Sequence, residues 1–127
     1  MGVKTLFNGA RFVGQAEGDR RKYYVFEAAA GYLVAAPQAP HSYSVTVTKR
    51  EAPEVISNKF RGRQITVSTL KTKGHRPDLF ARYFDRLNAL YVMVALGKAR
   101  KLKKRLGKAM LFKISSQVIT KPPAQLS

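Results

Sequence analysis

The sequence predicts an α+β protein in which a small N-terminal antiparallel sheet is followed by helices and a strongly basic segment. Up to residue 48, aromatic and β-branched residues come in short runs, which is typical of strands. After residue 51, apolar residues recur at helical spacing. With 45% apolar and 10% aromatic residues, the chain can build a core, so it does not belong with disordered basic tails. Its length fits one domain with at most a small appendage.

The first 47 residues are expected to form a β arm or hairpin region packed on the body of the protein. Residues 1–20 place four glycines among scattered apolar residues and predict a short strand or a loose arm. Residues 22–27 (KYYVFE) and 31–36 (GYLVAA) predict two strands joined as a hairpin. Tyr43, Val45 and Val47 alternate with small polar residues, which predicts a third strand that completes the sheet.

A first helix is expected from about residue 48 to Gly62. The residues TKRE at 48–51 fit a capping box, in which Thr48 and Glu51 each bind a backbone amide of the other. Apolar residues then follow at positions 55, 56 and 60. Because proline clashes with the preceding turn inside a helix, Pro53 also allows a start nearer Ala52, with the proline in the first turn.

Residues 64–74 (QITVSTLKTKG) allow two interpretations. Their β-branched residues favour a strand. They equally fit a short strand that leads into a helix of one or two turns, capped by Thr66 or Ser68 and ended by Gly74. The local sequence does not decide between them.

The clearest expected element is a long helix over about residues 77–95. Pro77 suits a first helical turn, and the carboxylate of Asp78 suits the positive end of the helix dipole. The charged residues Arg82, Asp85 and Arg86 fall largely off the apolar stripe of this helix. The stripe consists of Phe80, Phe84, Leu87, Leu90, Tyr91 and Val94.

Residues 97–115 also allow two interpretations. In one, the helix continues, with Ala99, Leu102, Leu106 and Met110 on one face. In the other, residues 97–103 and 108–115 form the strands of a hairpin that turns at 104–107. Two glycines in this segment each cost a helix about 1 kcal/mol relative to alanine, which favours the hairpin. The tail, residues 117–127, is expected to be disordered.

The order of these elements over residues 48–115 resembles the winged helix-turn-helix superfamily of DNA-binding proteins. Residues 65–70 (ITVSTL) resemble the start of its second helix, residues 76–96 its recognition helix, and residues 97–115 its wing. The resemblance implies a winged helix-like, nucleic-acid-binding domain over residues 48–116. It also leaves a homodimer open, because winged-helix proteins are often dimers.

The resemblance places the beginning of the third helix in the major groove of DNA and the wing on the backbone. His75, Arg76, Arg82 and, less surely placed, Arg86 would then face DNA, where arginine can read guanine or hold a phosphate. The basic run is expected to bind phosphates, with two further pairs of cations extending the patch. These residues are Lys98, Arg100, Lys101, Lys103, Lys104, Arg105 and Lys108, together with Arg61, Arg63, Lys71 and Lys73.

The charge of the chain points to a polyanionic partner. Lys and Arg number 24 against 7 Asp and Glu, a net charge of +17. Self-repulsion of this size opposes a compact state, and nucleic acid attracts such cations without regard to sequence. Duplex DNA is the preferred partner. An RNA-binding or ribosome-associated protein has the same need of cations and remains an alternative.

Other functions have weaker support. His75 beside basic residues allows a small metal-independent ribonuclease, although the chain is expected not to be an enzyme. Exposed tyrosines among Tyr23, Tyr24, Tyr32 and Tyr43 could stack nucleic-acid bases. With no cysteine and two histidines, neither a metal site nor a cofactor is expected. The longest uncharged apolar run, residues 89–97, is too short for a membrane span, so a soluble, cytoplasmic and nucleoid-associated protein is expected.

Overall fold

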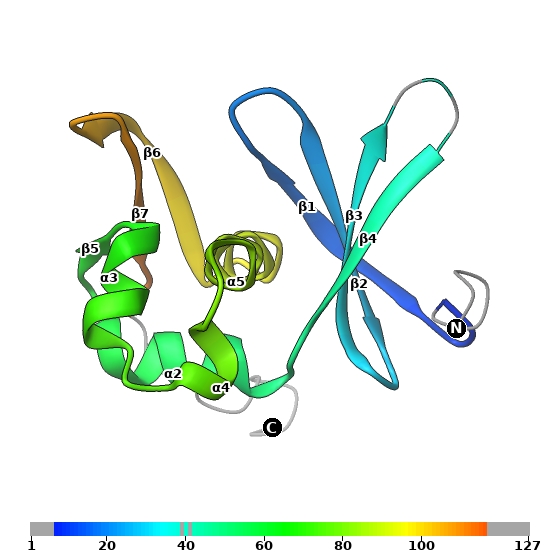
Figure 1. Cartoon of the computed structure of the whole chain (residues 1–127), viewed down its shortest axis with the longest axis horizontal. Coiled ribbons are helices and arrows are strands. Elements are labelled where there is room, and N and C mark those ends of the chain that lie inside the picture. The colour runs from blue at the N-terminus through cyan, green and yellow to red at the C-terminus, as the bar shows by residue number, and fades with distance from the viewer. Residues whose placement is uncertain (1–6, 39, 41, 117–127) are drawn as a thin grey trace, which may run out of the picture.

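The computed structural model describes residues 7–38, 40 and 42–116 and has the predicted α+β architecture (Figure 1). Four strands form an N-terminal antiparallel sheet with the strand order of the chain, β1-β2-β3-β4. The strands predicted at 22–27, 31–36 and 43–48 are therefore confirmed, and the ambiguous N-terminal segment supplies one more strand. The four strands are β1 (Arg11–Glu17), β2 (Lys22–Ala28), β3 (Gly31–Gln38) and β4 (Ser42–Thr48).

Gly31 is needed where β3 begins, directly after the tight turn from β2. Its φ angle of +133° is one that residues with a side chain rarely adopt. A Cβ atom at this position would lie 2.5 Å from the carbonyl oxygen of Thr48 on β4. Only glycine lets the three strands approach this closely.

The second part of the chain contains helices and a three-stranded sheet with the order β5-β7-β6. The interpretation of residues 64–74 as a short strand and a helix is correct: the helix has Thr66 as its N-cap and Gly74 as its C-cap. The elements are α2 (Glu51–Phe60), β5 (Gln64–Ile65), α3 (Val67–Lys73), α4 (Pro77–Phe80), α5 (Tyr83–Ala95), β6 (Ala99–Leu106) and β7 (Ala109–Ile114).

The basic segment is a hairpin and not a helix. Strand β6 continues to Leu106, three residues beyond the predicted end, and the chain reverses through Gly107 and Lys108. Gly107 has a φ angle of +63°, a conformation typical of glycine in two-residue hairpin turns. The register of β6 shifts between Lys101 and Arg105, which absorbs the extra length of this strand.

The capping box predicted at Thr48 is wrong. Thr48 is the last residue of β4, where it is buried and pairs with Tyr32 of β3. Helix α2 begins at Glu51 with Arg50 at the N-cap and no capping side chain. Pro53 is the third residue of α2, in the first turn, where proline removes no hydrogen bond that the helix would make.

The single long helix predicted over 77–95 is also wrong, because the chain breaks between α4 and α5. Arg82 is extended, with φ −108° and ψ 156°. Its backbone amide donates to the carboxylate of Asp85 at 3.3 Å, so the new helix starts with a cap. The guanidinium of Arg86 donates to the carbonyl oxygens of Phe80 and Ala81, at 2.8 and 3.1 Å, and so satisfies the end of α4.

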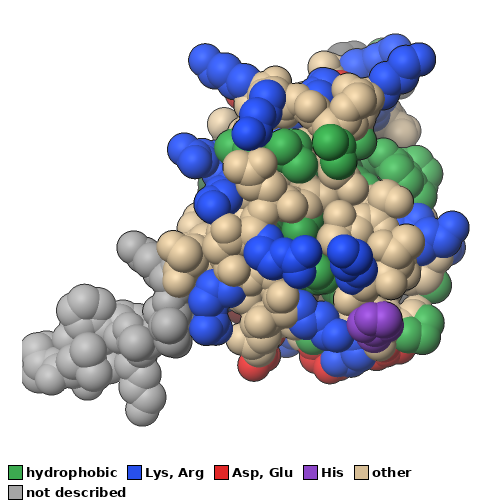
Figure 2. All heavy atoms as spheres, turned by 90° about the vertical axis from the view of Figure 1, so that its left-hand side faces the viewer, with side chains coloured by type: hydrophobic (Ala, Val, Ile, Leu, Met, Phe, Trp, Pro, Cys, Tyr) green, Lys and Arg blue, Asp and Glu red, His purple; other side chains and the backbone are tan. Residues whose placement is uncertain are grey.

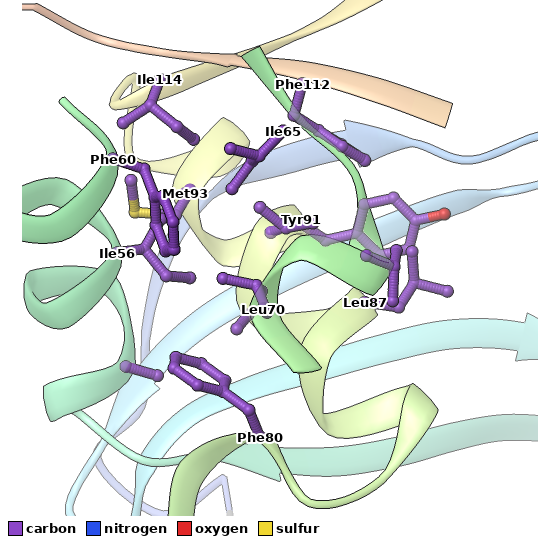
Figure 3. Close-up of a cluster of buried hydrophobic side chains, with 14 of the residues drawn as sticks. Ile56, Phe60, Ile65, Leu70, Phe80, Leu87, Tyr91, Met93, Phe112 and Ile114 are labelled. Carbon is purple, nitrogen blue, oxygen red and sulfur yellow. The ribbon is translucent and has the colours of Figure 1, made fainter. Parts of the chain in front are cut away.

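Helix α5 lies between the N-terminal sheet and the rest of the protein, and every residue from Arg86 to Met93 is buried (Figure 1). On one side, Val92 packs against Val25 and Val34 of the sheet. On the other, Figure 3 shows Met93 and Tyr91 turned toward side chains of α2, α3 and β7. The predicted apolar stripe is thus only part of the buried surface of this helix, and its member Phe84 is 67% exposed.

Candidate nucleic-acid interface

The positive charge is concentrated in the second part of the chain. Residues 51–116 contain 16 Lys and Arg against 4 Asp and Glu, a net charge of +12. Figure 2 shows Lys and Arg side chains spread over the face of the molecule on the α3 and β7 side, with acidic side chains gathered mainly along its lower edge. This face carries a positive field without a continuous acidic counterpart.

The hairpin of β6 and β7 presents the densest group of cations. Lys103, Lys104 and Lys108 are exposed around its turn, and neither strand contains an acid. The guanidinium of Arg105 donates to the carbonyl oxygen of Lys108 at 3.0 Å, which braces the turn. The sequence folds in this way because Gly107 permits the tight reversal, so the lysines project from a short, stiff support.

An acid from the N-terminal sheet reaches this hairpin. Asp19, in the turn between β1 and β2, forms ion pairs with Arg105 and, at 3.4 Å, with Lys101. The hydrogen bond from Arg105 lowers the pKa of Asp19 below its usual value. Two of the predicted phosphate-binding cations therefore already have a carboxylate partner within the protein.

Arg76 and Arg82, predicted to face DNA, also have carboxylate partners. The guanidinium of Arg76 lies 2.8 Å from Asp78 and 2.9 Å from Glu51, and its hydrogen bonds lower the pKa of Asp78. Arg82 lies 3.3 Å from Asp85 but remains 84% exposed. Arg76 thus joins α2 to α4, whereas Arg82 keeps most of its surface available.

Arg86, predicted to face DNA, is not on the surface. Its side chain is buried, with 7% of the residue exposed, and its hydrogen bonds go to the carbonyl oxygens at the end of α4. That prediction is wrong because it assumed an unbroken helix with Arg86 on the outer face. The break at Arg82 turns this side chain inward.

The remaining predicted cations are distributed around the hairpin and the helices. Arg61 and Arg63 flank Gly62 between α2 and β5, and the guanidinium of Arg63 lies 5.6 Å from the ring centre of Phe60. Lys71 and Lys73 are exposed in the last turn of α3. On the hairpin, Arg100 is exposed and Lys98, just before β6, is half-buried.

His75 lies among these cations, two residues after Lys73 and directly before Arg76. It lies in the loop between α3 and α4, exposed and with a φ angle of +55°. Among the described residues, no hydrogen bond or ion pair positions its ring.

Four residues that the sequence did not single out as site residues are among those that line a groove of about 870 Å³. Arg20 and Arg21 come from the turn between β1 and β2, and Tyr83 and Phe84 from the start of α5. Arg20 and Arg21 form too short a basic run to predict a binding site. Phe84 was assigned to the core because its spacing fits the apolar stripe.

The tyrosines of the sheet have different surroundings. Tyr23 stacks on Tyr91 of α5, with ring centres 4.3 Å apart, and belongs to the interior. Tyr24 and Tyr32 are half-buried, and only Tyr43 of the four is largely exposed, at 61%. They do not form a stacking platform together.

Within residues 7–38, 40 and 42–116, no three side chains of His, Cys, Asp and Glu come together as metal ligands. In the same part of the chain, no helix has the length and apolar character to cross a membrane. A scan against protein-family models and searches of curated proteins and of solved structures find no match to this chain.

Proposed function

We propose that this protein binds double-stranded DNA through the sugar–phosphate backbone, with the β6–β7 hairpin as the main contact. The observation that carries the proposal is the hairpin itself. It holds Lys103, Lys104 and Lys108 in the open, with no acid on either strand. Cations displayed in this way release counterions when they meet phosphates.

The order of elements supports a winged helix-like body. The helix α2, the short strand β5, the helices α3, α4 and α5 and the hairpin β6–β7 follow one another, and β5 pairs with the second hairpin strand β7. The short helix α4 is one element more than the expected order. In this scheme α5 takes the place of the recognition helix and β6–β7 that of the wing.

The burial of α5 favours backbone binding over base reading. A recognition helix must present one face along several turns to reach base edges in a major groove. Residues 86–93 of α5 are all covered, and only its first residues, such as Tyr83 and Phe84, are exposed. We therefore propose an architectural, largely sequence-independent mode of binding, as expected of a nucleoid-associated protein.

The test is the salt dependence of duplex binding. In fluorescence anisotropy with a labelled 20-base-pair duplex, Lys103→Gln/Lys104→Gln should weaken binding and reduce the slope of log affinity against log salt by about 0.9 for each lost phosphate contact. The matched control is Arg11→Gln/Lys49→Gln, which removes the same charge from the first residue of β1 and from the residue after β4, both outside the hairpin. Equal slopes for the two double variants would place the contact away from the hairpin.

A second measurement separates DNA from RNA. Unlabelled duplex DNA of mixed sequences should compete equally well, because backbone binding does not depend on the bases. Double-stranded RNA of the same length should compete less well, since its grooves differ in width and depth. Stronger competition by RNA would replace the proposal with an RNA-binding function.

A further inference from the structure

The 870 Å³ groove lies between the N-terminal sheet and the start of α5, on elements other than the hairpin turn. One wall is formed by residues of β2, β3 and β4, and the other by residues 82–88. At its inner side, the amide of Asn88 donates to the hydroxyl of Thr46 at 2.8 Å and joins the two walls. The groove exists because α5 packs on the sheet along its later turns only.

Two aromatic side chains line this groove without entering the core. Tyr83 is 50% exposed and Phe84 67%, and their rings meet edge to face with centres 5.5 Å apart. Large aromatic side chains usually account for much of the buried area of a core, so two neighbouring ones in the open indicate a binding surface. Flat rings of this kind offer a stacking surface to any nucleic-acid base.

The groove is lined by more cations than acids. Arg20, Arg21 and Arg82 line it, and a smaller hollow that shares Asp19, Tyr83 and Met110 continues toward Arg105 and Lys108 of the hairpin. The two acids of this surface, Asp19 and Asp85, are each paired with an arginine. The surplus of positive charge suits an anionic chain that passes over the aromatic rings.

We propose that this groove binds a single-stranded segment of nucleic acid. Bases stack on Tyr83 and Phe84, while Arg20 and Arg21 hold phosphates on one side and Lys108 on the other. The volume is in the range of small-molecule pockets, roughly 300–1,000 Å³, and so admits a few unstacked nucleotides but not a duplex. The site goes beyond the proposed duplex binding: it shares Lys108 with the hairpin contact but adds Arg20, Arg21 and the aromatic rings at the start of α5.

The absence of tryptophan from the chain allows a direct test. Phe84→Trp places a single tryptophan in the groove and keeps a stacking surface. Addition of an oligothymidine of 12 nucleotides should quench its emission, whereas a blunt duplex should quench it less at equal occupancy. Emission that oligothymidine leaves unchanged would overturn the proposal.

A second experiment measures the contribution of the aromatic rings. Tyr83→Ala/Phe84→Ala should bind oligothymidine about tenfold or more weakly, because each stacked base contributes measurably to affinity. Its duplex affinity should stay within about twofold of the parent. The control is Phe12→Ala, because Phe12 is also an exposed aromatic residue but lies on β1. This variant should keep its affinity for both oligothymidine and the duplex.

These experiments separate the two proposals and the two classes of ligand. Loss of duplex binding in Lys103→Gln/Lys104→Gln with quenching retained supports both sites. If no variant changes duplex binding but the tryptophan is still quenched, the proposed single-strand site in the groove is supported and the proposed duplex contact of the hairpin is wrong. Quenching of the tryptophan by poly-glutamate as strong as that by oligothymidine overturns the single-strand assignment in favour of an acidic peptide.

Discussion

The N-terminal sheet region (residues 7–50) and the C-terminal body (residues 51–116) differ in net charge. Between residues 7 and 50 there are 6 Lys and Arg against 3 Asp and Glu, and Glu27 alone pairs with both Arg11 and Arg50. Between residues 51 and 116 cations outnumber acids by four to one. The sheet region therefore has a net charge of +3 against +12 for the body, which leaves cations exposed on its hairpin. Under the proposed function, the sheet serves mainly to cover α5 and the body meets the nucleic acid.

The largest effect is expected from a charged residue buried between the N-terminal sheet and α5, because it tests whether the sheet must cover this helix. Val25 is fully buried against Val92 of α5, so Val25→Asp should lower the free energy of unfolding by more than about 3 kcal/mol, because an unpaired carboxylate cannot be accommodated there. Thermal unfolding followed by circular dichroism measures the effect. Val47→Asp, at a position that is 44% exposed on β4, is the matched control and should melt close to the parent.

The second test concerns the break that separates α4 from α5. Arg86→Met should cost about 2–3 kcal/mol, because the carbonyl oxygens of Phe80 and Ala81 lose hydrogen bonds from a charged donor. Chemical denaturation gives this value directly. Arg82→Met removes an exposed arginine from the same region and should change stability little; equal losses in both variants would contradict the assigned role of Arg86.

The third test concerns the start of α3, within the body. The hydroxyl of Thr69 accepts the backbone amide of Thr66 at 3.1 Å, so Thr69→Val should cost about 1 kcal/mol with its shape nearly conserved. Thr72→Val, on the exposed side of the same helix, is the control for β-branched packing. A larger loss of unfolding free energy in Thr72→Val than in Thr69→Val would contradict the role of Thr69 in capping α3.

The smallest expected effect on stability comes from the ion pairs that join the two regions. The lowered pKa of Asp19 means that its pairing stabilises the fold above about pH 4 and is lost as the pH falls through the folded-state pKa. The difference in Tm between the parent and Asp19→Asn should therefore shrink on going from pH 7 to pH 2. Glu17→Gln, which removes an equal charge from the last residue of β1, is the control for loss of a carboxylate as such.

The same Asp19→Asn variant sharpens the comparison on the functional side. Freed from the carboxylate, Arg105 and Lys101 can both meet phosphates, so the slope of log affinity against log salt for a duplex should steepen by about 0.9 for each new contact. Anisotropy at several salt concentrations measures it. An unchanged slope would mean that these two cations lie outside the DNA contact.

The sequence predicted the architecture better than the surroundings of single residues. Alternation around Tyr43 and spacing after residue 51 reflect local backbone geometry, so the strands and α2 could be found. The break at Arg82 could not, because it depends on Asp85 reaching back and on Arg86 reaching across to carbonyl oxygens. Periodicity could not reveal that α5 is covered on two sides. The residues of the sheet that pack on Val92, Val25 and Val34, lie more than 50 positions earlier in the chain.

The candidate site was predictable to a similar degree. The run of cations is visible in the composition, and its place on a hairpin follows once Gly107 is understood as a turn residue. Asp19 lies 82 positions before Lys101, so no local pattern could indicate that it pairs with the hairpin. Phe84 fitted the apolar spacing of the helix equally well as a buried or an exposed residue, and only the packing of the sheet distinguishes the two.

The position of α5 between two surfaces affects how the chain is made. When the first 50 residues leave the ribosome, the inner side of the sheet, with Val25 and Val34, has nothing to pack on. Its cover is synthesised only after some 35 further residues, once residues 83–95 have emerged. During that interval the nascent sheet exposes an apolar surface. Chaperones can bind this surface, or it can lead to aggregation before α5 covers it. The N-terminal sheet therefore gains its cover late, when α5 closes onto strands made much earlier.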